Sequence, residues 1–571
     1  EFANLPESRP DRKPRPARRC RFGPFPRPGP RRRYPRSMTT YITTPIYYVN
    51  DRPHIGHCYT TLLGDVTARF HRLMDPTPGS TFFLTGTDEH ADKVVTSAAA
   101  HSVTPQQWAD RNAAEFEKAF AFMNASHDDF IRTTQERHKS KVLEYIRALQ
   151  KRGDIYLGDY TGWFDASQEE YLTETAAKEA NYVSPVTGVP LVKKTEKNYF
   201  FKLSAYEARL KEHFAKHPEF VQPEARRNEV LGRLNELRDI PISRAITDDP
   251  TSQWGIKMPD DPTHRIYVWI DALFNYLSVV DTDARRKYWP ASVHFIAKDI
   301  LWFHAVIWPA LLMALRESDP KYGFVQLPKT VYSHAYWVRE GRKMSKSLGN
   351  FVSIEVLQAY ATKYGLDAVR WYLITQGPQG ATDADFSHAK FVEVYNAELA
   401  NGIGNCASRV SNMIEKYFGG STPAIGTAST RVHAACADAG GKVATAMKSL
   451  DTHAITSLAV AIIREVDAYI NDTQPFKLAK TVDQNPAAKG ELGAILANCA
   501  EAIRVASVLM SPAMPQKMAQ LWQGWNCAPA AGASLADLCV FGGPHGLQPG
   551  QKIAKGEALF MRADPAEAPP A

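Results

Sequence analysis

Cysteine is scarce in this sequence, and its placement excludes two kinds of structure. Only seven cysteines occur among 571 residues, none forms a C-x-x-C pair, and residues 59–405 contain none. An odd number of thiols without such pairs is typical of a reducing compartment and gives no disulfide framework. A zinc site built from thiolates is also excluded between residues 59 and 405.

Long hydrophobic runs are missing as well. The longest purely apolar stretch is residues 305–315, and it contains Pro309. About 20 apolar residues are needed to cross a bilayer, so we expect no membrane partner. With 44% hydrophobic and 23% charged residues, the chain has the composition of a globular protein of roughly three or four domains.

Outside its first residues the chain also lacks an excess of positive charge. Residues 1–37 hold twelve Lys and Arg against three acidic residues, a net charge of +9, so residues 38–571 carry −2 of the total +7. The overall charge therefore says nothing about RNA, and a nucleic-acid partner must be argued from particular sites.

The same 37 residues contain nine prolines and no apolar segment, which excludes a secretory signal. We interpret them as a disordered Arg/Pro-rich leader, with Met38 as the natural start and a cytoplasmic location. The alternative is a mitochondrial transit peptide, which the arginines favour but the scarcity of serine does not.

From Thr40 onward the pattern alternates between strands and helices. Residues 41–48 and 82–85 read as strands, and a helical period runs between them through Leu62, Val66 and Phe70. Thr104 followed by Pro105 is typical of a helix start. Strand, helix, strand, helix predicts an α/β fold with a parallel, Rossmann-type sheet.

Two later regions change this pattern. Residues 155–235 have scattered aromatics and turn residues, which indicates an insertion; strands are expected again at 265–270 and 293–296. Beyond about residue 390 the chain is Ala-rich with a 3.6-residue period, clearest at 455–469 and 494–510. This predicts a separate α-helical domain.

The segment His54-Ile55-Gly56-His57 lies where the first strand gives way to a helix. A helix start offers free N–H groups and a positive dipole end to an anion, and two imidazoles three residues apart can both donate to phosphate oxygens. Glycine lets a flat base or ribose approach the backbone. On its own the motif also fits ordinary surface histidines.

A second motif, Lys343-Met344-Ser345-Lys346-Ser347, follows far along the chain. Two lysines among small hydroxyl residues make a cationic loop that could neutralise a developing pyrophosphate. A solvated basic turn is the plain alternative for this motif alone. The two motifs in this order, both at strand-to-helix edges, favour the catalytic interpretation.

This pair resembles the signature of class I aminoacyl-tRNA synthetases. Five ordered segments narrow the resemblance to the methionyl-tRNA synthetases, over about residues 40–545: 45–50, 86–90, 196–201, 267–272 and 343–350. The resemblance implies a methionine–tRNA ligase. It activates L-methionine with ATP and Mg²⁺ to methionyl-adenylate, then transfers it to the 3′ end of tRNA(Met).

The resemblance also implies the site residues. The catalytic signature residues are His54, His57, Lys343 and Lys346; the ATP contacts are His54, Gly56, His57, Asp299, Arg244 and Lys346. The methionine site is Ile46, Tyr48, Asp88, Trp269, Ala272, Tyr276, Ile300 and His304, with Asp88 on the ammonium group. Plain core packing is the alternative for Trp269, Tyr276 and Ile300.

For the anticodon, the resemblance implies Asn405, Arg409 and Phe476, where the family usually has tryptophan in the last position. An ordinary Asn and Arg on a helix surface are the alternative for Asn405 and Arg409. The insertion resembles the zinc-free form, so no protein-bound metal is expected, and it is too small for an editing domain. The implied division is: leader 1–37; Rossmann halves 38–154 and 265–335; insertion 155–264; linker with the lysine loop 336–390; anticodon-binding domain 391–545; tail 546–571.

Four further departures add side-chain atoms near the expected site: Ala91, Ala297 and Ala335, where the family often has glycine, and Leu273, where it often has proline. Overpacking of this kind typically costs about 1–3 kcal/mol, which could either tune the affinity for substrate or be absorbed locally. Leu273 keeps open a synthetase for another apolar amino acid. A catalytically silent tRNA-binding relative is the other alternative, although the histidines and lysines are present. With no room for an appended tRNA-binding barrel, we expect a monomer.

Overall fold

The computed structural model describes residues 39–166, 170–172, 174–339, 341–344, 350–425, 430–482 and 485–570. Its central element is a six-stranded parallel sheet. The strands lie in the order β3 (Asp129–Arg132), β2 (Thr81–Asp88), β1 (Thr40–Tyr48), β12 (Val293–Ala297), β13 (Val331–His334) and β7 (Val221–Gln222). The first strand is central, and the strand order reverses between β1 and β12. In such sheets, ligands bind outside the carboxyl ends of the strands at this point.

The helices that connect these strands begin and end at recognisable signals. They are α1 (Ile55–Met74), α2 (Asp92–Ala100), α3 (Pro105–Phe122), α4 (Glu136–Arg152) and α10 (Trp308–Ser318). The predicted start at Thr104 is confirmed: its side chain accepts from the Gln107 N–H, and Gln107 returns a bond to the Thr104 backbone. Trp108, Phe116 and Phe120 are buried on the inner face of α3, as the periodicity predicts.

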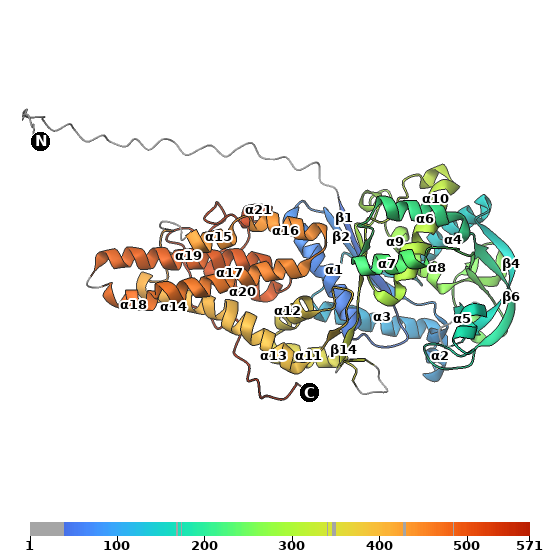
Figure 1. The fold of residues 1–571 in the computed structure, drawn as a ribbon, viewed down its shortest axis with the longest axis horizontal. Helices are drawn as coiled ribbons and strands as arrows, with labels where there is room; N and C mark the ends of the chain where they lie inside the picture. The colour runs from blue at the N-terminus through green and yellow to red at the C-terminus, as the bar shows by residue number, and fades with distance from the viewer. Residues whose placement is uncertain are drawn as a thin grey trace, which may run out of the picture. The chain divides into compact units, whose positions relative to one another are not determined.

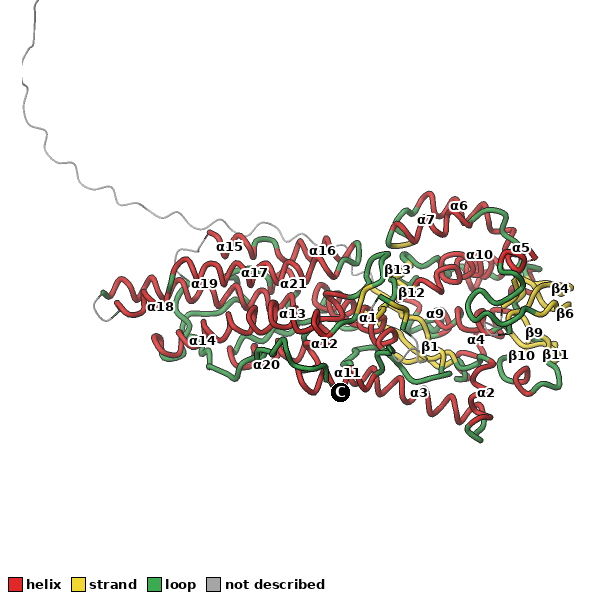
Figure 2. The backbone as a smooth tube through the Cα atoms, turned by 60° about the horizontal axis from the view of Figure 1, so that its bottom comes forward, coloured by secondary structure: helices red, strands yellow, loops and turns green. Residues whose placement is uncertain are grey.

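The segment predicted to be an insertion builds a second group of strands, visible apart from the parallel sheet in Figure 2. Its antiparallel sheet has the order β5 (Glu170–Leu172), β4 (Ile155–Asp165), β6 (Val192–Phe201), β8 (Ile240–Pro241). The helices of this segment are α5 (Glu174–Glu179), α6 (Glu207–Lys216) and α7 (Glu224–Arg233). One part does not stay outside, because β7 pairs with β13 at the edge of the parallel sheet.

The strand expected at residues 265–270 is partly wrong. The strand β11 (Asp261–Ile266) ends earlier and pairs antiparallel with β10 (Lys257–Met258) and β9 (Ser243–Ala245), outside the parallel sheet. The chain then turns into α8 (Val268–Leu273) and α9 (Asn275–Ser278). The run of β-branched and aromatic residues favours a strand locally, but the chain is helical here, and Asp271 of α8 is buried against two histidines.

The strand expected at 293–296 is confirmed as β12. After it come η4 (Lys298–Ile300) and a π-helical turn, η5 (Phe303–Ile307), which runs into α10. A small sheet, β15 (Arg342–Lys343), β14 (Trp337–Arg339) and β16 (Ala384–Asp385), precedes the helices α11 (Ile354–Tyr364), α12 (Leu366–Gln376) and α13 (His388–Val394).

Residues 395–538 are mainly helical, as predicted from the Ala-rich periodicity, and residues 539–570 consist of turns and loops (Figure 1). The helical elements are the π-helical η7 (Tyr395–Gly404), α14 (Asn405–Phe418), α15 (Thr430–Cys436), α16 (Ala439–Lys448), α17 (Thr452–Thr473), α18 (Pro475–Leu478), α19 (Pro486–Met510), α20 (Pro515–Trp525) and α21 (Leu535–Leu538). Residues 487–510 of α19 are long and apolar enough to cross a membrane, but 94% of that window is buried among the other helices. This places α19 as the core helix of the bundle.

Candidate functional site

A pocket lies at the carboxyl ends of β1 and β2, where the strand order reverses. We call it the β1 pocket, and define it by its lining residues: Pro45, Ile46, Tyr48, Asp88, Trp269, Ala272, Leu273, Tyr276, Ile300 and His304. All eight residues predicted for the methionine site are among them. Pro45 and Leu273 are additional.

The near wall of the β1 pocket comes from the two strands. The register between β1 and β2 shifts between Thr43 and Ile46, at the position of Pro45, which has no N–H for a regular ladder. Beyond the shift Ile46 and Tyr48, two residues apart, project to the same side of the strand. Tyr48 pairs with Asp88, the last residue of β2, so this carboxylate, 2% exposed, stands at the rim of the apolar wall.

The opposite wall comes from α8 and α9. Trp269, Ala272 and Tyr276 are spaced three and four residues apart, which brings them to one face. The Trp269 ring stacks on Phe303 with centroids 4.0 Å apart, and it meets the Tyr48 ring edge to face at 5.9 Å. Such packing fixes the aromatic wall before any ligand is bound.

Two buried polar side chains, Tyr276 and a neutral His304, form the inner end of the pocket. His304 lies in the π-helical turn, and burial lowers its pKa to about 4, so the ring is neutral. Its Nδ1–H donates to the Ile300 carbonyl at 2.9 Å, which leaves Nε2 to accept from the Tyr276 hydroxyl at 2.7 Å. The two side chains therefore satisfy each other.

At the start of α1, the two histidines cap the helix. The Gly56 N–H donates to His54 Nδ1 at 3.0 Å, and the His54 N–H donates to His57 Nδ1 at 3.2 Å. Because both Nδ1 atoms accept, each neutral ring carries its proton on Nε2. Burial and the neighbouring His54 hold the pKa of His57 well below its usual range. A Cβ at position 56 would lie 2.8 Å from His54 Cε1, so glycine makes room for the capping ring.

Two other predicted ATP contacts, Asp299 and Arg244, do not line the β1 pocket. Asp299 is exposed and directly precedes Ile300, and it interacts with Tyr336, whose pKa is raised by burial and then by Asp299. Arg244 lies on β9 with its guanidinium 4.1 Å from the Tyr267 ring centroid. Lys343 belongs to β15, whereas Lys346 lies outside the described residues.

The three predicted anticodon residues lie on two helices of the helical part: Asn405 and Arg409 on α14, and Phe476 on α18. We call the three residues together the α14 face. Asn405 and Arg409 are one turn apart on α14. Arg409 Nη1 is 2.8 Å from Asp467 on α17, the helix that ends just before Pro475 and Phe476. Phe476 is 45% exposed, which is unusual for a ring of this size.

Comparisons with known proteins agree with this geometry. Residues 40–180 and 175–411 match the family described as tRNA synthetases class I (M). The methionine–tRNA ligase of Streptomyces coelicolor is 40% identical over 545 residues, 92% of this chain and 96% of that protein. The Bacillus subtilis enzyme is 37% identical over 549 residues, 93% of this chain and 78% of that protein. The chain belongs to the methionyl-tRNA synthetases.

The fold comparison gives the same answer. The Mycobacterium tuberculosis methionyl-tRNA synthetase in complex with methionyl-adenylate superimposes with a TM-score of 0.81 at 33% identity, covering 92% of this chain and all of that one. As a methionyl-tRNA synthetase, this chain is a methionine–tRNA ligase: it uses ATP as a substrate, activates methionine and charges tRNA. The class I Rossmann-type fold followed by a helical region, predicted above, is confirmed.

The sequence did not reveal a buried group of one aspartate and two histidines next to the lining of the β1 pocket. Asp271, between the lining residues Trp269 and Ala272, is 2.6 Å from His90 Nδ1 and 2.7 Å from His138 Nε2. Burial raises the pKa of Asp271, but the two histidines outweigh it and hold the pKa at about 2. An acidic residue inside an apolar run was the available signal; its partners, 181 and 133 residues away, had none.

The departures from the family pattern leave the backbone unstrained where the structure gives their angles. Ala91 has φ −71° and Ala297 φ −84°, which any residue adopts, so neither position requires glycine. Ala335 is fully buried and donates its N–H to the Pro378 carbonyl at 3.0 Å. Leu273 is the departure that contacts the ligand space, since it lines the β1 pocket.

Proposed function

We propose that the β1 pocket is the methionine site of this ligase and that the start of α1 is its ATP site. The observation that carries the proposal is that residues far apart in the sequence line the same pocket. Eight residues from β1, β2, α8, α9 and the turn after β12, spread over residues 46–304, line one pocket at the switch point of the sheet. One buried carboxylate among apolar and aromatic walls fits an amino acid with an ammonium group and an apolar side chain.

In this site Asp88 takes the ammonium group through charge-assisted hydrogen bonds. The Tyr48 and Trp269 rings contact the thioether, and sulfur–aromatic contacts contribute about 0.3–1.5 kcal/mol each. Tyr276 and His304 already satisfy each other, so they close the inner end without presenting an unpaired polar atom. An apolar side chain is therefore favoured over a hydroxylated one of similar size.

For the activation step, His54 and His57 present Nε2–H donors, and Gly56 leaves the backbone close to the nucleotide. Asp299 contacts the ribose, and Arg244, Lys343 and Lys346 contact the phosphates or the carboxylate. Mg²⁺ enters with ATP as part of the substrate and needs few protein ligands. Holding the carboxylate in line with the α-phosphorus could supply roughly 7–11 kcal/mol, and cationic groups on the leaving pyrophosphate supply more.

For the transfer step, we propose tRNA(Met) as the partner and the α14 face as the reader of its anticodon. Asn405 offers a donor and an acceptor to an unstacked base, Arg409 pairs or stacks, and Phe476 stacks. The division proposed is that of the sequence: leader 1–37, Rossmann halves 38–154 and 265–335, zinc-free insertion 155–264, lysine-loop linker 336–390, anticodon domain 391–545 and tail 546–571. A monomer in the cytoplasm is the proposed state; a mitochondrial location is the alternative if residues 1–37 are a transit peptide.

The test is ATP–pyrophosphate exchange on the purified chain, with each amino acid supplied separately. We expect exchange with methionine alone, and its loss in Lys346→Ala. Exchange with leucine, isoleucine or valine instead would assign the pocket to another apolar amino acid, and Leu273→Pro then shows whether Leu273 is responsible. A folded protein without exchange for any amino acid would contradict the proposal and favour a silent tRNA-binding protein.

A further inference from the structure

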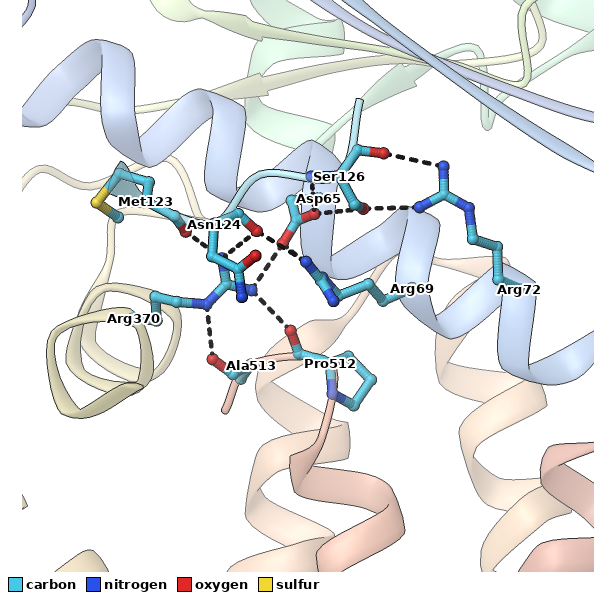
Figure 3. A network of polar contacts seen from close by, with 9 residues as sticks. All are labelled: Asp65, Arg69, Arg72, Met123, Asn124, Ser126, Arg370, Pro512 and Ala513. Carbon is cyan, nitrogen blue, oxygen red and sulfur yellow. Dashed lines mark hydrogen bonds and ion pairs between the residues drawn. The ribbon is translucent and has the colours of Figure 1, made fainter. Parts of the chain in front are cut away.

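A single guanidinium joins segments that are far apart in the sequence (Figure 3). Arg370 on α12 is fully buried, and all of its five N–H groups are used. They donate to a carboxylate oxygen of Asp65 at 2.6 Å and to the carbonyls of Met123 (2.6 Å), Asn124 (3.4 Å), Pro512 (2.8 Å) and Ala513 (2.9 Å).

The carboxylate of Asp65 is equally committed. The oxygen that meets Arg370 also accepts from Arg69 Nε at 2.9 Å. The other oxygen accepts from the backbone N–H and the hydroxyl of Ser126, at 2.7 and 2.6 Å. Asp65 is fully buried as well, so the ion pair and its hydrogen bonds form one satisfied network in the interior.

The segments joined in this way connect to the proposed ATP site at the start of α1 and to the α14 face. Asp65 lies in the middle of α1, whose first turn carries His54 and His57. Pro512 and Ala513 form the turn between α19 and α20. The helices α14 and α17, which carry Arg409 and its partner Asp467, both pack on α19.

Stability alone does not account for such a pair. Burying two charges costs several kcal/mol of hydration each, and apolar side chains of similar volume often serve as well or better. A guanidinium with all five donors used instead fixes the relative positions of its acceptors, because its N–H groups lie in one rigid plane.

The start of α1 has supports of its own. His54 and His57 cap it, the Ile55 N–H donates to the Val352 carbonyl at 3.1 Å, and His54 pairs with Ser353 in a β-bridge. The ATP end of the helix is thus held independently of Asp65. Loss of the Arg370 contact would release the middle of α1 from the helical part while leaving the ATP end in place.

We propose that Arg370 is a positioning residue that couples occupancy of the α14 face to the transfer of methionine onto tRNA. A shift of α19 on anticodon binding moves the Pro512 and Ala513 carbonyls, and Arg370 passes this displacement to α1 through Asp65. This rests on the functions proposed above for the α14 face and for α1. Coupling between two sites is typically worth a five- to 150-fold change.

The experiment compares three variants of the full chain: Arg370→Lys, Asp65→Asn and Arg504→Lys. The last is a matched control. Arg504 is also a buried arginine that pairs with a carboxylate, Glu501 at 2.8 Å, and with carbonyls, those of Leu538 and Val540, but all its partners lie in residues 501–540 of the helical part. Each variant is assayed for methionine-dependent pyrophosphate exchange without tRNA. It is then assayed for charging of tRNA(Met) transcripts with the native anticodon or with a changed first anticodon base.

For Arg370→Lys we expect the exchange kcat to stay within about threefold of the unsubstituted enzyme, and the charging kcat to fall about tenfold. The anticodon change, which lowers the charging kcat of the unsubstituted enzyme, should then have about tenfold less effect on kcat. Arg504→Lys should lose thermal stability yet keep the anticodon effect. Asp65→Asn should reproduce Arg370→Lys, and the double variant should be no worse than the poorer single one.

Parallel loss of exchange and charging by the same factor in Arg370→Lys would overturn the proposal in favour of a structural role. The proposal would also be overturned if the anticodon change lowered the charging kcat of Arg370→Lys by the same factor as that of Arg504→Lys. If Arg370→Lys does not fold, Asp65→Asn, which keeps the side-chain size, decides by the same criteria. Failure of the function proposed for the α14 face is distinguishable, because Phe476→Ala would then charge tRNA(Met) like the unsubstituted enzyme. Failure of the proposed methionine and ATP sites would instead show as an unsubstituted enzyme without methionine-dependent exchange.

Discussion

The β1 pocket and the α14 face differ in how far their side chains are committed before a ligand arrives. In the pocket, Tyr276 and His304 are each 2% exposed and bonded to each other, and Trp269 is stacked on Phe303. On the α14 face, Phe476 is 45% exposed and the Arg409 side chain is 32% exposed, with contacts to Asp467 and, at 3.5 Å, to Asn471.

The difference agrees with the ligand that we propose for each surface. A single amino acid offers few polar groups, so selectivity must come from a preformed shape, and a preformed pocket loses little conformational entropy on binding. Unstacked bases bring large flat surfaces and their own hydrogen-bonding edges. An exposed ring and a loosely held arginine can adapt to them. Substitutions should therefore affect the two regions through different kinetic constants.

The largest effect is expected from Asp88→Asn. The substitution keeps the size of the side chain but removes the charge that faces the ammonium group. Loss of one partner of a buried charge pair costs about 2–5 kcal/mol, so methionine-dependent exchange should fall about a hundredfold or more in kcat/KM. The KM for ATP should change little.

Asp283→Asn is the control for this experiment, because Asp283 is fully exposed and its nearest cation, Arg286, is 4.0 Å away. It should retain full exchange activity. An Asp88→Asn enzyme with an unchanged KM for methionine would mean that the ammonium group binds elsewhere.

A smaller effect, confined to tRNA, is expected from Phe476→Ala. Stacking of one base on an aromatic ring is worth about 1–3 kcal/mol, so the KM for tRNA(Met) in charging should rise about tenfold while exchange stays unchanged. Phe476→Trp, which adds area and an N–H donor, should lower that KM. If both variants charge tRNA like the unsubstituted enzyme, Phe476 does not contact a base.

The smallest effect concerns pH and the pocket. The pKa of His304 is about 4 in the folded protein and about 6.5 in the unfolded chain, so its contribution to stability is complete above pH 6.5 and is lost as the pH falls towards 4. Between pH 8 and pH 6 this loss amounts to about 1 kcal/mol.

Urea unfolding at the two pH values measures the loss. His304→Gln should lose about 1 kcal/mol less than the unsubstituted protein over this range. The other histidines contribute equally to both, apart from His294, whose pKa is lowered by burial and also by His304. Equal losses in the two proteins would show that His304 titrates normally in the folded state.

Local signals in the sequence predicted those elements whose cause is local. The alternation of strands and helices, the Thr104 cap and the long helices α17 and α19 need only periodicity and neighbouring residues, and all are confirmed. The failure at residues 265–270 has the opposite cause. The helix α8 there carries Asp271, which meets His90 and His138, and no local pattern reveals a partner more than a hundred residues away.

The residues of the candidate site could be named from the sequence only because they resemble a known family, and their roles stay predictions. Nothing in their spacing brings Ile46, Asp88 and Trp269 together; the parallel sheet does, by aligning the carboxyl ends of β1 and β2 opposite α8. Residues that act from behind, such as Asp271 and Arg370, carry no motif of their own. Their importance becomes visible only when the polar contacts they make are followed in three dimensions.

The shape of the β1 pocket depends on the number of residues in the π-helical turn η5. It widens the helix between Trp302 and Trp308, so that Phe303 reaches Trp269 while the next residue, His304, reaches Tyr276. Each residue of an α-helix advances by about 100°, so deleting one residue here would swing these two side chains away from their partners by a similar angle. In this stretch of chain, a change of length would disturb the lining of the β1 pocket more than many substitutions.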